Sequence, residues 1–487
     1  MSSPVVGHVR RRTRAVLALA LCGLAVAAGF TGRPASAAPP SAEAGPALDW
    51  LAGQVLDNGG SLPGFSPGSS DWGLTADAVL AFVAAGRSSD PAAVAATDLL
   101  VSNAAEFTTW APEMPQVRVA GATAKLLLVV TAMGRDATAA GVDLDAELRT
   151  LMVDDGPASG RFADRVPDPA WDSSNGFGQS LALLALAMTP DGVPAQATSY
   201  LLQQQCPAGG FRLSYVGSNG CSSDAEADTD ATAMALQALL AVPRSAVVSR
   251  SSERAAAWLL SNQGNDGSFG GTGPTSAPNS NSTGLIAQSL RAAGQTEAAD
   301  RAAAWIAQRT WLDPATAAGT AAADHVGAIA YQPGTRATAL VEGISDLAAD
   351  QWRRATAQGV LAFGLAPFGP GGVDPLPPVT TTTAPPSSTT TTTTTTMPST
   401  MSTLPAPPST TSPTPTDAPR PPELVPEPPA DASDVLDDTA SRPHAGGRNV
   451  GSRLALTGAA PVPLVAGAFS LMLLGAAMCV AADRRRR

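Results

Sequence analysis

The sequence RAAAWL at residues 254–259 returns almost unchanged as RAAAWI at residues 301–306. Between the two copies lie a glycine-rich turn, QGNDGSFG at residues 263–270, and a polar segment that opens an apolar stretch, NSTGLIA at residues 281–287. Alanine and leucine at helical spacing, with a turn at a fixed place in the pattern, indicate helix hairpins that repeat along the chain. We therefore predict an all-α fold.

The same order of turn and capped helix occurs elsewhere in residues 43–370. QCPAGGF at residues 205–211 precedes DTDATAMAL at residues 228–236, and looser copies begin near residues 63 and 160. With two weaker helices near residues 120 and 334, the second helices are anchored near residues 75, 123, 179, 231, 283 and 337, about 52 residues apart. Six such hairpins would form two concentric rings, an (α/α)6 toroid of six helix-hairpin repeats.

These turns, which run from a glutamine to a phenylalanine, resemble the QW-type repeats of the α/α toroid superfamily. That superfamily includes squalene and terpene cyclases, protein prenyltransferase β subunits, transcobalamin-like carriers and complement thioester domains. Residues 228–236 are similar to the Asp-Thr-x-x-Met-Ala helices of transcobalamin-type proteins. The resemblance covers residues 43–370 and implies the toroid fold, but it leaves the activity open because these relatives do different things.

Both ends of the chain indicate export. Arginines at positions 10, 11, 12 and 14 precede an apolar stretch and the small residues Ala35, Ser36 and Ala37, which is typical of a cleaved signal peptide over residues 1–37. At the other end, an apolar run at residues 459–482 is followed by a basic tail at residues 483–487. The run can cross a hydrocarbon core of about 30 Å, so we expect one transmembrane helix with its arginines in the cytoplasm.

A pentapeptide stands directly before this apolar run, made of Leu454, Ala455, Leu456, Thr457 and Gly458. The pentapeptide, span and basic tail together resemble a sortase cell-wall sorting signal, in the Leu-Ala-X-Thr-Gly form of high-GC Gram-positive bacteria. The resemblance implies sortase as a partner, cleavage between Thr457 and Gly458, and attachment to peptidoglycan. The single lysine and the many alanines are typical of an actinobacterial genome. A plain anchor through residues 459–482 is the alternative, and both place the protein on the extracellular face.

Composition restricts the rest of the chain. Residues 371–453 are rich in Pro, Thr and Ser and should form a disordered stalk. The formal net charge of −11 argues against nucleic acid as a partner. Because Cys22 and Cys479 lie in the terminal apolar segments, Cys206 and Cys221 remain in the exported part, where an oxidising compartment predicts a disulfide between them. With three histidines and no CxxC pair, we expect no metal site and no cofactor.

Polar groups at the N-termini of the inner helices should meet at one mouth of the toroid. We expect ligand-binding residues there, and the candidates are Asp71, Asp77, Gln179, Asp228, Asp230, Asn281, Thr283 and His325. Helix capping or a solvated loop is the competing explanation for most of them.

Catalysis needs more than this mouth, and the weak candidates for it are Asp228, Asp230 and Asp172. Class II terpene cyclases protonate an alkene with the middle Asp of an Asp-x-Asp-Asp motif, and here Ala231 replaces the final carboxylate. At 5% aromatic residues, the domain offers few π faces for carbocations. Asp71 and Asp172 could form the carboxylate pair of a glycan-active enzyme, but nothing in their spacing shows it.

We therefore predict a surface-anchored toroid protein that binds a ligand or partner without catalysis, as an adhesin or a small-molecule carrier, rather than an enzyme. A corrinoid carrier of the transcobalamin type is disfavoured, because the stalk begins where its second, small β domain would stand. The alternative is a secreted enzyme, either similar to terpene cyclases and prenyltransferases or acting on glycans from an (α/α)6 barrel.

Overall fold

The computed structural model of the chain describes residues 41–64, 68–215 and 220–370. The predicted signal peptide, stalk, sorting pentapeptide, transmembrane helix and basic tail all lie outside these residues, and so they stay predictions. Within the described ranges, no helix combines the length and the apolar character needed to cross a membrane.

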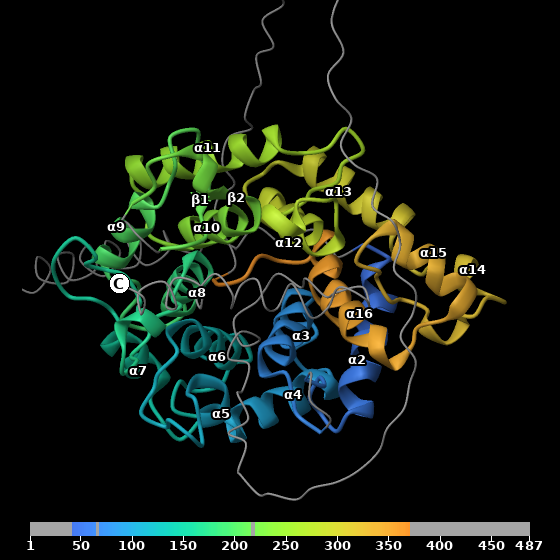
Figure 1. Cartoon of the computed structure of the whole chain (residues 1–487), viewed down its shortest axis with the longest axis horizontal. Coiled ribbons are helices and arrows are strands. Elements are labelled where there is room, and N and C mark those ends of the chain that lie inside the picture. The colour runs from blue at the N-terminus through green and yellow to red at the C-terminus, as the bar shows by residue number, and fades with distance from the viewer. Residues whose placement is uncertain (1–40, 65–67, 216–219, 371–487) are drawn as a thin grey trace, which may run out of the picture. The chain divides into compact units, whose positions relative to one another are not determined.

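In the described part of the chain, six inner helices contact one another in a closed order (Figure 1). The order is α3 (Trp72–Ala84), α6 (Ala120–Ala132), α8 (Gly176–Leu186), α10 (Thr229–Ala241), α12 (Ser280–Ala292) and α16 (Asp346–Gly359), which contacts α3 again. Outside them lie α2 (Ala44–Asp57), α4 (Pro91–Ser102), α7 (Leu144–Thr150), α9 (Ala195–Gln203), α11 (Ala246–Ser261) and α13 (Thr296–Arg309). This mainly helical arrangement is consistent with the α/α toroid expected from the sequence.

Small residues let the inner helices pack closely. Helix α12 is buried along almost its whole length, and Gly284 faces α16 so tightly that a Cβ atom there would lie 2.1 Å from the carbonyl oxygen of Gln358. A larger side chain at this position would push the two helices apart. Gly284 therefore sits at a close helix–helix contact.

One hydrogen bond recurs where a turn meets an inner helix. A side-chain oxygen of the inner helix accepts from the backbone N–H of a residue in a preceding turn or loop; it lies in the first turn of the helix in four cases and near the end of α16 in the fifth. The pairs are Thr75 with Leu62 (2.9 Å), Gln179 with Phe162 (3.0 Å), Thr232 with Phe211 (2.7 Å), Thr283 with Phe269 (3.0 Å) and Thr356 with Ile329 (2.9 Å). The bond fixes each turn against its helix, which explains why the two recur together in the sequence.

The last inner helix differs from the prediction. We placed it near residue 337, in α15 (Pro333–Glu342), but the helix that closes the ring is α16, where Thr356 makes the recurrent bond. Helix α15 buries only Ala339 and exposes 78% of Val341. The prediction was wrong because the extra helices α14 (Pro314–Ala317) and α15 are inserted between α13 and α16.

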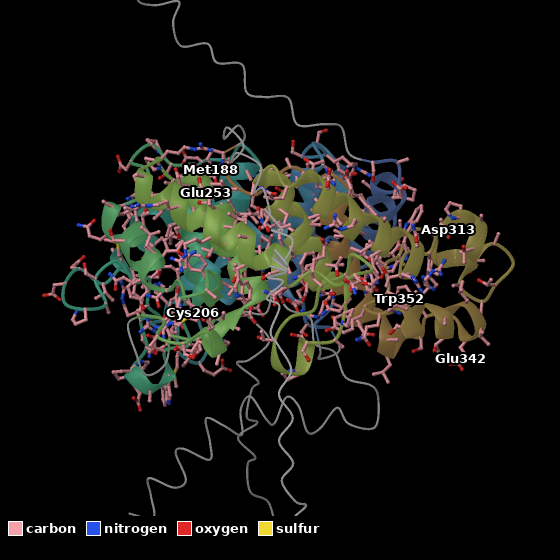
Figure 2. All side chains as sticks on the ribbon, turned by 90° about the horizontal axis from the view of Figure 1, so that it is seen from above. Met188, Cys206, Glu253, Asp313, Glu342 and Trp352 are labelled. Atoms are coloured by element: carbon pink, nitrogen blue, oxygen red, sulfur yellow. A yellow bond between two sulfur atoms is a disulfide. The ribbon has the colours of Figure 1, made fainter. Side chains whose placement is uncertain are left out.

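The inserted helices have a small core of their own, outside the ring. It contains Trp50 of α2, Trp352 of α16, and Leu312 from the segment between α13 and α14. Trp352 has 1% of its surface exposed. Figure 2 shows Trp352 nearer the middle of the molecule and the exposed Glu342 at its edge. This corner therefore packs against the ring through α16 and α2.

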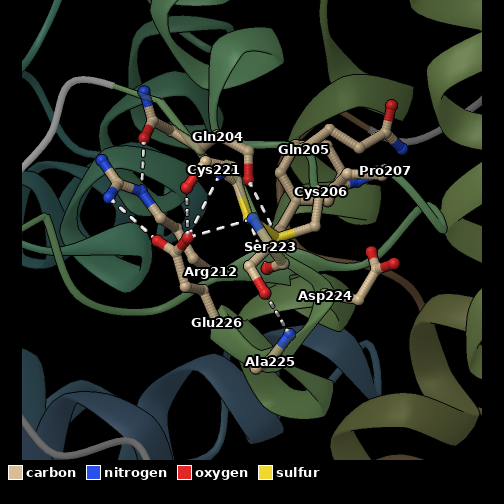
Figure 3. Close-up of a disulfide and its surroundings, with 12 residues drawn as sticks. Gln204, Gln205, Cys206, Pro207, Arg212, Cys221, Ser223, Asp224, Ala225 and Glu226 are labelled. Carbon is tan, nitrogen blue, oxygen red and sulfur yellow. Dashed lines mark hydrogen bonds and ion pairs between the residues drawn. A yellow bond between two sulfur atoms is a disulfide. The ribbon is translucent and has the colours of Figure 1, made fainter.

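The predicted disulfide between Cys206 and Cys221 is confirmed (Figure 3). It lies beside a short antiparallel pair, β1 (Phe211–Arg212) and β2 (Ala227–Asp228), in which Phe211 is opposite Asp228. Glu226 and Gln204 both contact the buried Arg212, with Arg212 Nε donating to Gln204 Oε1 at 2.8 Å. This braced loop leads the chain directly into α10.

The segment of residues 363–370 crosses the C-terminal ends of the inner helices, where Figure 1 shows it as the orange chain in the middle of the ring. Ala366 N–H donates to Ala84 O at 2.9 Å, and Phe368 N–H donates to Gln237 Oε1 at 2.9 Å. Gln288 Nε2 donates to Ala366 O at 2.5 Å. The segment therefore closes this end of the ring, and the polar mouth is at the opposite end.

Candidate active site

Asp230 lies in the first turn of α10, at the end of the ring opposite residues 363–370. The first turn is held in place by Asp228, whose Oδ1 accepts from Ala231 N–H at 2.7 Å and so caps the helix. The cap and the small β pair fix Asp230 two residues later, with 1% of its surface exposed. This position buries a carboxyl group between α10 and α12.

The two carboxyl oxygens of Asp230 have different surroundings. Oδ2 accepts a hydrogen bond from Ser282 Oγ of α12 at 3.1 Å, whereas Oδ1 is buried without a hydrogen-bond partner in the described structure. Burial, and next the charge of Asp228, raise the pKa of the Asp230 carboxyl to about 8. Since Ser282 donates to Oδ2, Oδ1 is the oxygen left to carry a proton when the acid is neutral.

A buried carboxylic acid that keeps its proton at neutral pH has the properties of a general acid. The proton is on the oxygen that has no protein partner, so it is available to a substrate atom brought within reach. Both Asp228 and Asp230 were catalytic candidates, and the structure separates them: Asp228 holds the helix, while Asp230 holds the proton.

Asn281 of α12 is the second unusual polar group in this region. It is 3% exposed, and neither Oδ1 nor Nδ2 of its side chain has a hydrogen-bond partner. It directly precedes Ser282, which contacts Asp230. Tyr331 lies on the other side of α12, where its carbonyl accepts from Ser280 N–H at 2.9 Å, and burial and then the charge of Asp230 raise its pKa to about 12.

The loop of residues 270–279, which contains the short helix η3 (Gly273–Thr275), covers Asp230 from outside. Thr229 Oγ1 donates to Gly270 O at 2.7 Å, and Thr272 Oγ1 donates to Asp228 Oδ2. A Cβ atom on Gly271 would lie 3.2 Å from Asp230 Oδ2. The carboxyl group is therefore closed off by this loop, which must move for a substrate to reach it.

A cavity of about 380 Å³ lies beside the covering loop. Its lining takes Ala277 and Pro278 from the loop, and Gln332 from the residue next to Tyr331. Trp305 and Arg309 of α13 form part of its outer wall. The cavity thus borders the loop that covers Asp230 and the segment that follows Tyr331.

Two further candidates, Asp71 and Asp77, are engaged in buried ion pairs on the other side of the ring. Asp77 Oδ1 is 2.6 Å from Lys125 Nζ of α6, and burial raises the pKa of Asp77 while Lys125 opposes that rise. Asp71 caps α3 by accepting from Leu74 N–H at 2.8 Å, and its other oxygen contacts Arg354. These carboxyl groups are matched by cations, unlike Asp230.

The remaining candidates have structural partners. Gln179 and Thr283 hold turns through the recurrent bond, so neither reaches into the mouth as a free group. Asp172 pairs with Arg161 at 2.7 Å. His325 accepts from Trp50 Nε1 at 3.5 Å in the outer corner near α2.

The sequence reasoning missed Ser282, Gly271 and Lys125. Ser282 stands between Asn281 and Thr283, which were both predicted as site residues. Nothing in the local sequence indicates that Ser282, rather than its neighbours, contacts Asp230. Gly271 belongs to a turn whose position over α10 depends on contacts distant in sequence. Lys125, as the single lysine in a long apolar helix, did carry a signal for a buried partner.

No family model matches the chain, and no curated protein matches it. Among solved structures, it is similar to the type II terpene cyclase MstE from Scytonema, at 17% identity over 66% of this chain and 98% of that one, with a TM-score of 0.45. It is also similar to protein geranylgeranyltransferase-I of Candida albicans, at 10% identity over 66% and 93%, TM-score 0.45. A third is an unsaturated glucuronyl hydrolase from Bacillus sp. GL1, at 14% identity over 66% and 94%, TM-score 0.43.

These three structures are named as enzymes, which contradicts our expectation that the chain binds a ligand or partner without catalysis. The interpretation of Ala231 as the loss of the acid did not include burial. In the structure, burial and the charge of Asp228 raise the pKa of Asp230 without a third carboxylate.

Proposed function

We propose that this protein is an enzyme that starts the cyclisation of an isoprenoid chain by donating a proton from Asp230. The observation that carries the proposal is the pair of unequal oxygens on this buried carboxyl: Oδ2 held by Ser282, and Oδ1 without a partner. A proton on Oδ1 would be available to a substrate atom brought within hydrogen-bond reach.

The chemistry balances without an oxidant or a cofactor. The proton leaves Asp230 Oδ1, and the π electrons of a terminal alkene form the new C–H bond, which leaves a cation on the neighbouring carbon. A second alkene attacks that cation and forms a C–C bond. Loss of a proton from the final cation to water forms the last double bond, and the product is an isomer of the substrate. Asp230 takes up a proton from water to start again.

The surrounding residues have separate roles in this scheme. Asp228 fixes the start of α10, and Ser282 stabilises the Asp230 carboxylate that remains after proton transfer. The loop at residues 270–279 admits the substrate and then shields the first cation, next to Asp230, from water. The closing segment at residues 363–370 blocks the other end of the ring.

The test is incubation of the purified protein with geranylgeranyl diphosphate, with squalene, and with geranylgeranyl dihydroxybenzoate, the substrate named for the Scytonema cyclase. Mass spectrometry should find a cyclised product with the mass of its substrate. Asp230→Asn should abolish the product, while Asp191→Asn, at an exposed aspartate, should leave it unchanged. If none of the three substrates is converted, or if conversion survives Asp230→Asn, the proposal is overturned. Release of sugar from a glycan panel would point to the glycan-active alternative.

We also propose that the enzyme is exported and held at the cell surface by sortase or by its transmembrane helix. Its support is the order of signal peptide, stalk, pentapeptide, apolar run and basic tail in the sequence. The disulfide between Cys206 and Cys221 fits an oxidising compartment. Fractionation of cells that express Thr457→Ala would separate the two modes, because only sortase attachment needs this threonine.

A further inference from the structure

The polar atoms of Asn281 are buried at a cost that the protein itself does not offset. Both side-chain atoms lack a hydrogen-bond partner, although the residue is 3% exposed. A buried polar group without a partner is destabilising, and native proteins keep few of them. A bound ligand or an ordered water molecule can supply the hydrogen bonds of such a group.

The neighbouring Asn279 shows what a structural asparagine looks like in the same helix. It is 1% exposed, and its Oδ1 caps α12 by accepting from Ser282 N–H at 2.9 Å. Its Nδ2 donates to the carbonyl oxygens of Thr275 and Ala277, both at 3.1 Å. Asn279 is therefore fully used by the fold, while Asn281, two residues later, is not used at all.

The position of Asn281 relates it to the acid. The recurrent bond aligns the inner helices, with Thr232 of α10 equivalent to Thr283 of α12. In this alignment Asn281 corresponds to Asp230, and each stands two residues before the threonine. The two helices contact each other, and Ser282 joins them through Asp230 Oδ2. Asn281 is thus the nearest equivalent of Asp230 on the next helix of the ring.

We propose that Asn281 is a specificity-determining residue that binds a hydroxyl-bearing group at the end of the isoprenoid that meets Asp230. A hydroxyl group can accept from Nδ2 and donate to Oδ1, so it matches both unpartnered atoms, whereas a bare hydrocarbon matches neither. This inference rests on the proposed function and narrows its substrate class from isoprenoids in general to isoprenoids that carry a hydroxyl beside the terminal alkene that Asp230 protonates.

The test uses squalene and its terminal diol with one hydroxyl on each methyl carbon beside the terminal alkene, which leaves that alkene intact. Binding of these matched probes is measured on Asp230→Asn so that no turnover intervenes. The diol should bind at least about tenfold more tightly than squalene, because a site built for a hydroxyl rejects the analogue that lacks it. Adding Asn281→Leu should remove this preference and leave squalene binding equal or tighter. Equal binding of both probes to Asp230→Asn, or a preference that survives Asn281→Leu, overturns the inference.

Thermal unfolding separates recognition from a structural role. Asn281→Leu removes two unpartnered atoms and should keep or raise the midpoint temperature, whereas Asn279→Leu removes a cap and two loop bonds and should lower it. A large fall for Asn281→Leu would mean that the side chain supports the fold, which overturns the inference. A preference for the diol in a protein that cyclises no substrate would support Asn281 and refute the proposed function alone.

Discussion

The buried carboxyl groups on the two sides of the ring have different electrostatic surroundings. On the side of α3 and α6, Asp77 lies 2.6 Å from the Lys125 ammonium, and both side chains are buried. On the side of α10 and α12, Asp230 is as deeply buried, but its neighbours are Ser282 and the carboxylate of Asp228. A cation stabilises the charged form of an acid, and its absence leaves the proton in place. The difference separates a carboxyl group that stabilises the fold from one that can act as an acid.

The largest expected effect comes from removing each carboxyl group in turn. Asp230→Asn should reduce the cyclisation rate by about 10³-fold or more, because a positioned general acid contributes up to about 10⁴-fold. Asp77→Asn should leave the rate per folded molecule close to that of the unchanged protein. Initial rates normalised to the folded fraction check this. Comparable rate losses in both variants would show that the two sides do not differ in function.

Stability should respond in the reverse order. Asp77→Asn leaves Lys125 buried beside a neutral amide, which should cost about 3 kcal/mol of unfolding free energy. The double variant Asp77→Leu with Lys125→Met should recover most of this loss, since it removes both charges. Urea denaturation measures both values. Asp230→Asn should not destabilise the protein, and a loss near that of Asp77→Asn would contradict the comparison.

The pH dependence follows from the raised pKa of Asp230. The protonated carboxyl is the active form, so the rate should be level near neutral pH and fall about tenfold per unit above pH 8. The unfolded carboxyl ionises near its ordinary pKa of 3.8, so this group makes the fold less stable as pH rises from about 4 to about 8. Asp230→Asn should therefore gain stability relative to the unchanged protein over that range. A rate that rises with pH through 8 would exclude Asp230 as the acid.

The smallest expected effect concerns Ser282, which is the one hydroxyl that contacts Asp230 Oδ2. Ser282→Ala removes a hydrogen bond that lowers the pKa of Asp230, so the alkaline limb of the pH profile should move to higher pH. The rate near neutral pH should fall several-fold, because a bond to the remaining carboxylate is worth about 1 kcal/mol. Ser289→Ala, on the same helix with its hydroxyl bonded to Ile286 O, is the matched control. A limb that stays in place would argue that Ser282 does not contact the acid during the reaction.

Much of the ring could be predicted from local patterns. The turns and capped helices around residues 228–236 and 281–287 are read from neighbouring residues, and so is the disulfide of Cys206 with Cys221. Asp228, Asp230 and Asn281 were all among the candidates, and the structure brings them together where α10 and α12 meet.

What could not be predicted depends on contacts between distant segments. Nothing in residues 333–342 shows that two inserted helices move the ring-closing role to α16. The proton on Asp230 depends on the cover formed by residues 270–279 and on the lack of a nearby cation, and both are properties of the folded chain. The missing carboxylate at Ala231 was visible in the sequence, but the burial that replaces its effect was not.

The segment that closes the ring also determines how the domain bears a mechanical load. Ala366 and Phe368 are bonded to α3, α10 and α12, and the chain continues from residue 370 toward its C-terminal part. Tension applied along that continuation reaches these few hydrogen bonds before it reaches any helix of the ring. They lie in series with the pull and would break one at a time. When the domain is pulled from its C-terminal end, residues 363–370 should therefore detach first. The inner helices around Asp230 should unfold only at a higher force.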